Sequence, residues 1–557
     1  MSAQSSSCVK SCEFSGPPEN AGSFDLTARG RLTSRSFRVG HDEGLDAMIE
    51  PGAAYKARHA ALYDHIERHQ GEYVEEIRRF LRIPGFSDTG EGIERSAAAA
   101  LKYLEMAGSS DAKLVETGGY PVVYGKLQSK NPNAKTLAVY SIYDETPVDA
   151  SEWKVEPLGA EIVDPARIGL PEEMGSLLCS RAALNHRGPM LAFILAVQAM
   201  REVEGDVPVN IVWAWDGEEE IGSPNFHIFL KKYENELMRC DALYGPSMQQ
   251  SFEGPMVITR GYKGALLFEL ECKGGDWGGT VDGRHTWAAH APWVDAPMMR
   301  LIHAVGSLFD SDHNMVIDGV AERVVPLLPE DMAEIEALKQ TWSDDDDRLM
   351  KLQLGVKKFR GGRTVPELVE RWVTCVGINV QGIVGGYTGP AFYTMLPQSA
   401  TAKVDIRLPV GPTPTEVLNL LRAHLDRRGF TEIQIKHGRG YEGYRTSTDD
   451  PIVQAAIRAA AIHGVSTSIL PSSNAIGPAS MFAKPPLNLP SIWTGLGHGE
   501  RLHQPDEYIR VDAIREFMQF AVTYLHEWAA SRMPGQDGGK RKPGGQLAQK
   551  ANQTRQE

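Results

Sequence analysis

Two short segments hold the side chains best suited to chemistry. The segment DGEEEIGS, at residues 216–223, carries three consecutive glutamates, and HQPDE, at residues 503–507, carries a histidine followed by two acids. One carboxylate beside a metal ion can deprotonate water, while a second carboxylate and an imidazole hold the ion. Each segment alone also fits an ordinary role, because acids favour helix starts and single histidines often bind nothing. The helices and strands around the two segments therefore have to show whether their side chains meet in one site.

The glutamate run follows a short buried strand, which we expect at residues 209–217. A second buried strand is expected at Thr136–Asp144, and residues 189–203 between the two have helical periodicity. Strand, helix and strand at this spacing predict a βαβ unit and a largely parallel sheet flanked by helices. Because such sheets bind ligands at the carboxyl ends of their strands, we expect Asp144 and the glutamates to lie close together.

A different pattern follows from about Gly261. Residues 264–274 and Ser399–Pro409 alternate apolar and polar side chains, which indicates a half-exposed antiparallel sheet. Near the start, residues 55–83 have the periodicity of one long helix. The predicted fold class is α/β, with a mostly parallel sheet in a catalytic domain and an inserted α+β domain. The expected divisions are a disordered tail at 1–42, the catalytic domain at 43–261 and 439–533, the inserted domain at 262–438 and a second tail at 534–557.

Composition excludes several classes of protein. The chain has 557 residues and a net charge of −14, with 42% apolar and 23% charged residues, which are globular proportions. Net acidity without a basic stripe argues against nucleic acid as a partner, and the apolar runs are too short to span a membrane. Six cysteines without CxxC pairs and the lack of a secretory signal indicate the reducing cytoplasm.

Six segments stand in an order that is typical of one family. They are IYDETP (142–147), SRAALNHRGP (180–189), DGEEEIGS (216–223), YTMLP (393–397), AKVDIRLP (402–409) and HQPDE (503–507). With them, between about residues 55 and 530, the chain resembles the zinc-dependent exopeptidase and amidohydrolase family that includes carnosine dipeptidases, bacterial glutamate carboxypeptidases and aminoacylases. The resemblance also implies that the inserted domain is a lid through which two chains form a homodimer.

The resemblance implies a metal centre that has lost part of its ligands. The family holds two zinc ions side by side. The histidine of the first ion corresponds to Ile142, and its later acid corresponds to Pro246 or Ser247. The acid that bridges both ions corresponds to Asn185. None of these four residues offers a carboxylate or an imidazole.

The ligands of the second ion are retained. The resemblance implies that Glu219 is the general base and that Glu220 and His503 bind metal. We therefore expect one divalent ion, zinc or manganese, held by Glu220, His503 and Asn185. Asn185 is also expected among the substrate-binding residues. His186 is a further candidate ligand, and it is equally consistent with a histidine that binds no metal.

Four further residues complete the expected site. Asp144 keeps its family position and is expected among the catalytic residues. His285, with His290 as a competing assignment, matches a histidine that crosses the dimer interface to stabilise the oxyanion. Arg407 matches the arginine that binds a substrate carboxylate, for which a guanidinium is well suited. The turn SSNAIGP, in which we expect Gly477 to contact substrate, replaces the family's Gly-Gly-Ser turn.

These residues predict a metal-dependent hydrolase that cleaves an amide or peptide C–N bond in a small amino-acid-like substrate. One alternative is a catalytically silent relative that binds a ligand or partner, because three metal-site residues are replaced. Another is an enzyme with altered chemistry, such as deamination. The retention of the base, of two ligands and of Arg407 favours the hydrolase.

Overall fold

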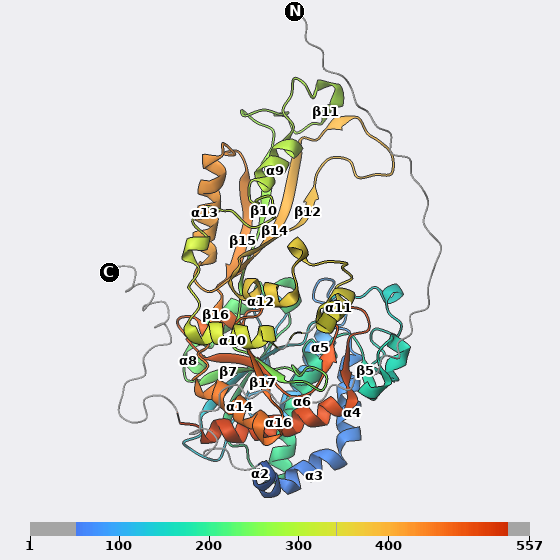
Figure 1. The fold of residues 1–557 in the computed structure, drawn as a ribbon, viewed down its shortest axis with the longest axis vertical. Helices are drawn as coiled ribbons and strands as arrows, with labels where there is room; N and C mark the ends of the chain where they lie inside the picture. The colour runs from blue at the N-terminus through green and yellow to red at the C-terminus, as the bar shows by residue number, and fades with distance from the viewer. Residues whose placement is uncertain (1–51, 341, 343, 533–557) are drawn as a thin grey trace, which may run out of the picture. The chain divides into compact units, whose positions relative to one another are not determined.

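The computed structural model describes residues 52–340, 342 and 344–532, so both expected tails lie outside the described residues. Its largest sheet has eight strands in the order β1-β2-β6-β3-β7-β18-β8-β17 (Figure 1). The four central strands are parallel neighbours, with an antiparallel pair at one edge and a parallel pair at the other. The sheet is therefore mostly parallel, as predicted. Its strands are β1 (Lys113–Val115), β2 (Val122–Leu127), β3 (Thr136–Ile142), β6 (Asn210–Asp216), β7 (Ala242–Pro246), β8 (Met256–Thr259), β17 (Thr467–Leu470) and β18 (Ser491–Thr494).

Helices cover both faces of this sheet, because its central strands are apolar on both sides. On one face α6 (Arg187–Val203) packs against α16 (Val511–Ala530), which also contacts α14 (Pro451–Ile462). These helices come from distant parts of the chain and lie side by side (Figure 1). Further helices of the catalytic part are α5 (Ile93–Met106), α7 (Phe226–Lys232), α8 (Glu234–Leu237) and α15 (Ala479–Ala483).

The single helix predicted at residues 55–83 is wrong in its continuity. The structure has three short helices, interrupted at His59 and His69, where ψ is 19° and 10° instead of about −42°. The apolar face persists through the breaks, which is why the periodicity predicted one helix. The three helices are α2 (Gly52–Arg58), α3 (Ala60–Arg68) and α4 (Gln70–Leu81).

The inserted part is built on a four-stranded antiparallel sheet in the order β12-β14-β10-β15. One face packs on two helices and the other is largely exposed, so its central strands alternate buried and exposed side chains as predicted. We call this part the lid; its exact limits stay a prediction, because contacts do not divide the described residues into separate units. Its elements are β10 (Gly264–Lys273), β12 (Gly377–Val384), β14 (Ser399–Leu408), β15 (Gln434–Tyr441), α9 (Pro297–Gly306) and α13 (Pro414–Arg427).

Three helices at the base of the lid were not anticipated from the sequence. An ion-pair cluster anchors the first of them, because Asp331 pairs with Arg260 and lies 3.0 Å from Arg445 Nη1. These two arginines precede and follow the lid sheet in the chain. The helices are α10 (Pro329–Gln340), α11 (Asp344–Gln353) and α12 (Val365–Thr374).

Short strands complete the structure. A second four-stranded sheet, in the order β19-β20-β5-β4, lies beside the segments expected to hold the site. Two small pairs, β9–β16 and β11–β13, belong to the root and the tip of the lid. These strands are β4 (Glu161–Val163), β5 (Leu177–Cys179), β9 (Gly261–Tyr262), β11 (Thr286–Trp287), β13 (Met395–Leu396), β16 (Tyr444–Arg445), β19 (Gly499–Glu500) and β20 (Tyr508–Arg510).

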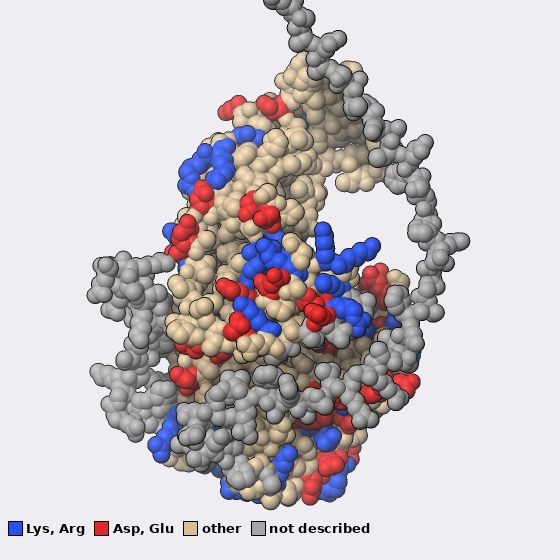
Figure 2. All heavy atoms as spheres, in the orientation of Figure 1, with Lys and Arg blue, Asp and Glu red and all other residues tan. Residues whose placement is uncertain are grey.

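Charged side chains of both signs are interspersed over the middle of the face seen in Figure 2, whereas the region around β11 carries few. Among the described helices, none has the length and apolar character needed to cross a membrane.

Candidate active site

The candidate site begins where two neighbouring strands end. Strands β3 and β6 are parallel and in register, with Ile142 opposite Asp216. The backbone N–H of Glu220, just beyond β6, donates to Asp144 Oδ2 over 2.9 Å. The expectation that Asp144 and the glutamates lie together at the carboxyl edge of the sheet is therefore confirmed.

Three of the four expected metal ligands converge at this edge. Asn185 Nδ2 donates to Glu220 Oε1 over 2.7 Å and lies 3.3 Å from His503 Nε2. His503 Nδ1 lies 3.7 Å from Glu220 Oε2. The Glu220 side chain is buried, whereas that of His503 is half exposed, so the group is open on one side.

A buried glutamate holds this arrangement in place. Glu507, which directly precedes β20, accepts hydrogen bonds from the backbone N–H groups of Ala182, Leu184 and Asn185. It also forms a buried ion pair with Arg181 over 2.9 Å. One carboxylate thus fixes the turn between β5 and α6 and positions Asn185 beside Glu220. Sequence reasoning had placed Glu507 in the HQPDE segment without assigning it a role.

His186 lies at the start of α6, next to Asn185. Its ring packs on Trp493, with centroids 5.5 Å apart, and its buried Nδ1 has no hydrogen-bond partner within the described chain. Burial, aided by repulsion from His503, lowers the pKa of His186 to about 4. The ring is therefore neutral at physiological pH, which is the form of imidazole that binds metal.

Three carboxyl groups are crowded behind these residues. Burial, with the charges of Asp144 and Asp216, raises the pKa of Glu219 well above its usual value. The pKa of Asp144 is raised to about 6 and that of Asp216 to about 7, mainly by burial. Such a cluster has an electrostatic demand for a cation, because like charges this close cannot all ionise without one. Gly477 lies beside Glu219, since a Cβ there would stand 3.5 Å from Glu219 Oε1.

The residues at the positions that correspond to the ligands of the family's first zinc ion carry no carboxylate or imidazole. Ile142 is buried in an apolar cluster that includes Phe226 and Trp493. Pro246 ends β7 and Ser247 follows it. Within the described residues, no group of three His, Cys, Asp or Glu ligand atoms within 4.8 Å of one another includes Glu220 or His503. The polar groups gathered at this edge are thus the carboxylate of Glu220, the imidazole of His503 and the carboxamide of Asn185.

The lid faces the site with polar side chains of β14 and β15. Arg407 Nε donates to Asp405 Oδ1 over 3.2 Å, and its Nη1 reaches Asn474 O at 3.5 Å. Tyr441 ends β15 of the lid: burial and the charge of Glu219 raise its pKa, and Arg407 acts in the opposite sense. Sequence reasoning missed Tyr441, because nothing in the pattern of an exposed strand marks one tyrosine for the site.

His285 lies apart from the other expected residues. It is exposed beside β11, its Nδ1 accepts from Gln398 N over 3.3 Å, and none of its described contacts reaches Glu219. The competing His290 lies 3.3 Å from Thr286 Oγ1 and stacks on Trp293. Neither histidine joins the site within one chain.

Fold and site together define a two-part metallohydrolase. The model of peptidase family M20/M25/M40 matches residues 164–527, and the chain belongs to this family. It is a metal-dependent hydrolase that acts on peptide-type C–N bonds, and the resemblance stated from the sequence is confirmed.

Relatives and solved structures agree with this assignment. The chain is 25% identical to a human Beta-Ala-His dipeptidase over 449 residues, which is 76% of this chain and 83% of the relative. It is 23% identical to a Cys-Gly metallodipeptidase of Saccharomyces cerevisiae over 393 residues, covering 66% and 76%. An M20 family metallo-carboxypeptidase of Sulfolobus solfataricus superposes with a TM-score of 0.71 at 27% identity, covering 83% of this chain and 100% of the other.

Proposed function

We propose that this hydrolase works with one divalent ion, zinc or manganese, held by Glu220, His503 and Asn185. The observation that carries the proposal is the convergence of these three side chains, whose polar atoms lie 2.7–3.7 Å apart. The position of a ligand of the other ion is occupied by the buried, apolar Ile142. In the metal-free chain the Asn185 amide turns its Nδ2 toward Glu220, so the amide would have to flip for its oxygen to face the ion. His186, with its unpartnered buried Nδ1, is the candidate for a fourth ligand.

The residues around this position have distinct roles in the proposal. When bound, the ion would polarise the substrate carbonyl and make water more acidic. Glu219 accepts the proton of the attacking water and returns it to the leaving amine. Asp144 fixes the backbone of Glu220 through its 2.9 Å hydrogen bond. The lack of a side chain at Gly477 leaves space for substrate beside Glu219.

The proposed substrate is a small amino-acid-like amide with a free carboxylate, such as a dipeptide or an N-acyl amino acid. Arg407 would bind the carboxylate, since Arg407 and Tyr441 lie opposite Ala265 on the two strands that flank β10, and the charges of Arg407 and Glu219 both act on Tyr441. The names of the relatives, a Beta-Ala-His and a Cys-Gly dipeptidase, support this class. A screen of dipeptides, acylated amino acids and small amides with added Zn²⁺, Mn²⁺ or Co²⁺ would identify the substrate.

The substitution Glu219→Gln tests the proposal. Gln cannot take a proton from water, so we expect turnover to fall by about 10²- to 10⁴-fold while metal content and melting temperature barely change. Glu218→Gln is the matched control: Glu218 accepts from Tyr120 N and Asn225 instead of facing the ligands, so turnover should stay within about tenfold of wild type. Undiminished turnover in Glu219→Gln would exclude this residue as the base.

The alternative, a catalytically silent relative that binds a ligand or partner, rests on the same replacements of metal ligands at Ile142, Asn185 and Pro246. Metal counting by mass spectrometry separates the possibilities when Glu220 and His503 are substituted together. One ion lost on substitution supports the proposed centre. Two ions lost would indicate a complete family centre, and none lost, with no hydrolysis of any screened amide, would indicate a binding protein.

We further propose a cytoplasmic homodimer formed through the lid. The cysteines in the described part are unpaired thiols, which supports a reducing compartment. The tip of the lid exposes large apolar side chains, which supports an interface there. In such a dimer His285 would act on the site of the partner subunit, which accounts for its position far from Glu219 in its own chain.

A further inference from the structure

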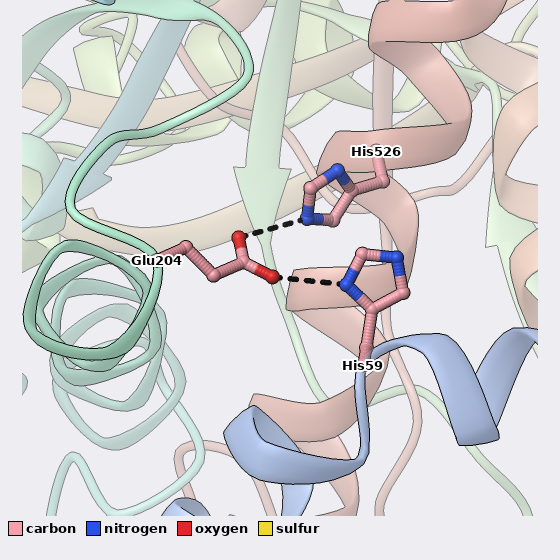
Figure 3. Close-up of side chains that lie close together, drawn as sticks. All are labelled: His59, Glu204 and His526. Carbon is pink, nitrogen blue, oxygen red and sulfur yellow. Dashed lines mark hydrogen bonds and ion pairs between the residues drawn. The ribbon is translucent and has the colours of Figure 1, made fainter.

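Three metal-binding side chains meet away from the candidate active site. His59 lies between α2 and α3, Glu204 directly follows α6, and His526 is on α16 (Figure 3). His59 Nδ1 lies 2.9 Å from Glu204 Oε1, and His526 Nε2 lies 3.2 Å from Glu204 Oε2. The carboxylate is thus held between two imidazoles, each facing a different oxygen.

This group stands out among the described residues. It is the one set of three His, Cys, Asp or Glu whose ligand atoms all lie within 4.8 Å of one another. The function proposed above does not use it, because α6 runs from the active site at His186 to Glu204. With 17 residues, that helix separates the two places by about 25 Å.

The geometry is close to that of a coordinated ion. Two ligands of a tetrahedral zinc ion at about 2.1 Å lie roughly 3.4 Å apart, so the two N···O distances are short by a few tenths of an ångström. Small side-chain rotations would admit the ion, which replaces the protons shared between the imidazoles and the carboxylate. The side chains are 12%, 27% and 24% exposed for His59, Glu204 and His526, so water can reach a fourth position.

The surroundings hold the ligands in place. The His59 ring stacks on Tyr55 at 4.7 Å and lies 4.4 Å from the His526 ring. The helices that carry the ligands pack against one another, since α3 contacts α6 and α16. The three ligands therefore approach one point from elements that are already in contact, so binding requires little ordering of the chain.

We propose that His59, Glu204 and His526 form a structural site for one zinc ion. Two neutral imidazoles and one carboxylate, with water in the fourth position, suit zinc better than magnesium or calcium. The ion would link the start of the described chain to the end of α6 and to the C-terminal helix. The rival state is the same triad held by hydrogen bonds alone.

Zinc counting on an untagged chain tests the site. The substitutions Glu220→Gln and His503→Ala would first remove the ligands of the proposed active-site ion. After stripping and equilibrium dialysis against Zn²⁺, we expect this background to retain one ion per chain by mass spectrometry. Adding His526→Ala or Glu204→Gln should reduce the count to near zero. Glu204→Gln keeps the shape of the side chain, so the test does not depend on the folding of a single variant.

His65→Ala is the matched control, because His65 is on α3 and lies 3.4 Å from Glu202 without a second imidazole at that carboxylate. It should retain the ion. Zinc should also raise the melting temperature of the background by a few degrees and leave that of the His526→Ala chain unchanged. No bound ion in the background, or equal binding with and without His526, would overturn the proposal. Wild-type turnover is independent of either result, so failure here leaves the proposed catalytic function intact.

Discussion

Asn185 shows how one atom changes the charge of the candidate site. The Nδ2 of its amide donates to Glu220 Oε1, where the family places a second negative charge. The carboxamide therefore stabilises the buried glutamate without a cation, at the cost of one anionic ligand. This residue lets the site keep its shape with less charge.

The substitution Asn185→Asp should destabilise the metal-free chain and strengthen zinc binding. A second carboxylate beside Glu220 would lower the stability of the metal-free chain by about 1 kcal/mol and raise its affinity for zinc about tenfold. Urea unfolding and zinc titration measure the two effects. Asn225→Asp is the control, because Asn225 also donates to a glutamate, Glu218, over 3.0 Å; it should cost stability without tightening zinc binding. Equal zinc affinities in the two variants would contradict the role of Asn185.

A second single-residue prediction concerns pH. Burial lowers the pKa of His463 to about 4, and its Nε2 lies 2.8 Å from Thr523 Oγ1. The unfolded chain binds a proton at about pH 6.5, so the contribution of the neutral ring is complete above that pH. It is lost as the pH falls toward 4, by roughly 2–3 kcal/mol. Urea unfolding from pH 7 to 4.5 should show a shallower decline in His463→Gln than in wild type. The exposed His437→Gln should follow wild type, and parallel curves for all three chains would refute the prediction.

Among the elements, the turn between β5 and α6 depends on Glu507. This carboxylate accepts from three backbone N–H groups and from Arg181, all within a buried region. Arg181 N and Ala183 N find backbone carbonyl acceptors, whereas the N–H groups of Ala182, Leu184 and Asn185 are satisfied by the Glu507 side chain. The position of Asn185 thus depends on a residue more than 300 positions later.

Replacing Glu507 by Gln should therefore destabilise the chain by about 3 kcal/mol, because the buried Arg181 loses its counter-charge. Turnover should fall as well, since Asn185 would no longer be fixed beside Glu220. Urea unfolding and steady-state kinetics measure these effects. Glu161→Gln breaks an exposed pair with Arg167 and should cost less than about 0.5 kcal/mol. A similar cost for both variants would mean that Glu507 does not support the turn.

The elements also show what the sequence could predict. Strands β3 and β6 were predictable because they are continuous apolar runs, and their register brought Asp144 and Glu220 together. The helix breaks at His59 and His69 could not be predicted, because the buried residues keep their helical spacing through the breaks. Tyr441 and the anchoring role of Glu507 depend on long-range contacts that leave no local pattern. Helix α10 is fixed by Asp331 and the distant Arg260, which is equally invisible to periodicity.

At the scale of the whole molecule, the exposed apolar side chains at the tip of the lid indicate an interaction surface. Trp293 is 82% exposed, and Trp287 and Phe392 are also exposed. The pairing of β11 with β13 brings the two lid segments that carry them side by side. Apolar side chains gathered in this way mark an interaction surface more often than a solvated one. A second copy of the lid is the occupant that the proposed role of His285 requires.

The substitutions Trp293→Asp and Phe392→Asp together should convert a dimer into a monomer, because they place charge in an apolar interface. Light scattering after size exclusion measures the mass directly. Met238→Asp is the control, since Met238 is an exposed apolar residue of the catalytic part and should leave the mass unchanged. A dimer that survives the double substitution would place the interface elsewhere. If the dimer is lost, turnover should fall with it, because His285 would have no partner site.

The burial of Ile142 has a consequence for how this chain can change over time. Its side chain is part of an apolar cluster with Phe226 and Trp493, so a histidine introduced there would lose packing before it gained an ion. A carboxylate would also be needed near Pro246, at the end of another strand. If the chain binds a single ion as proposed, the packing around Ile142 would therefore oppose the gain of a second one.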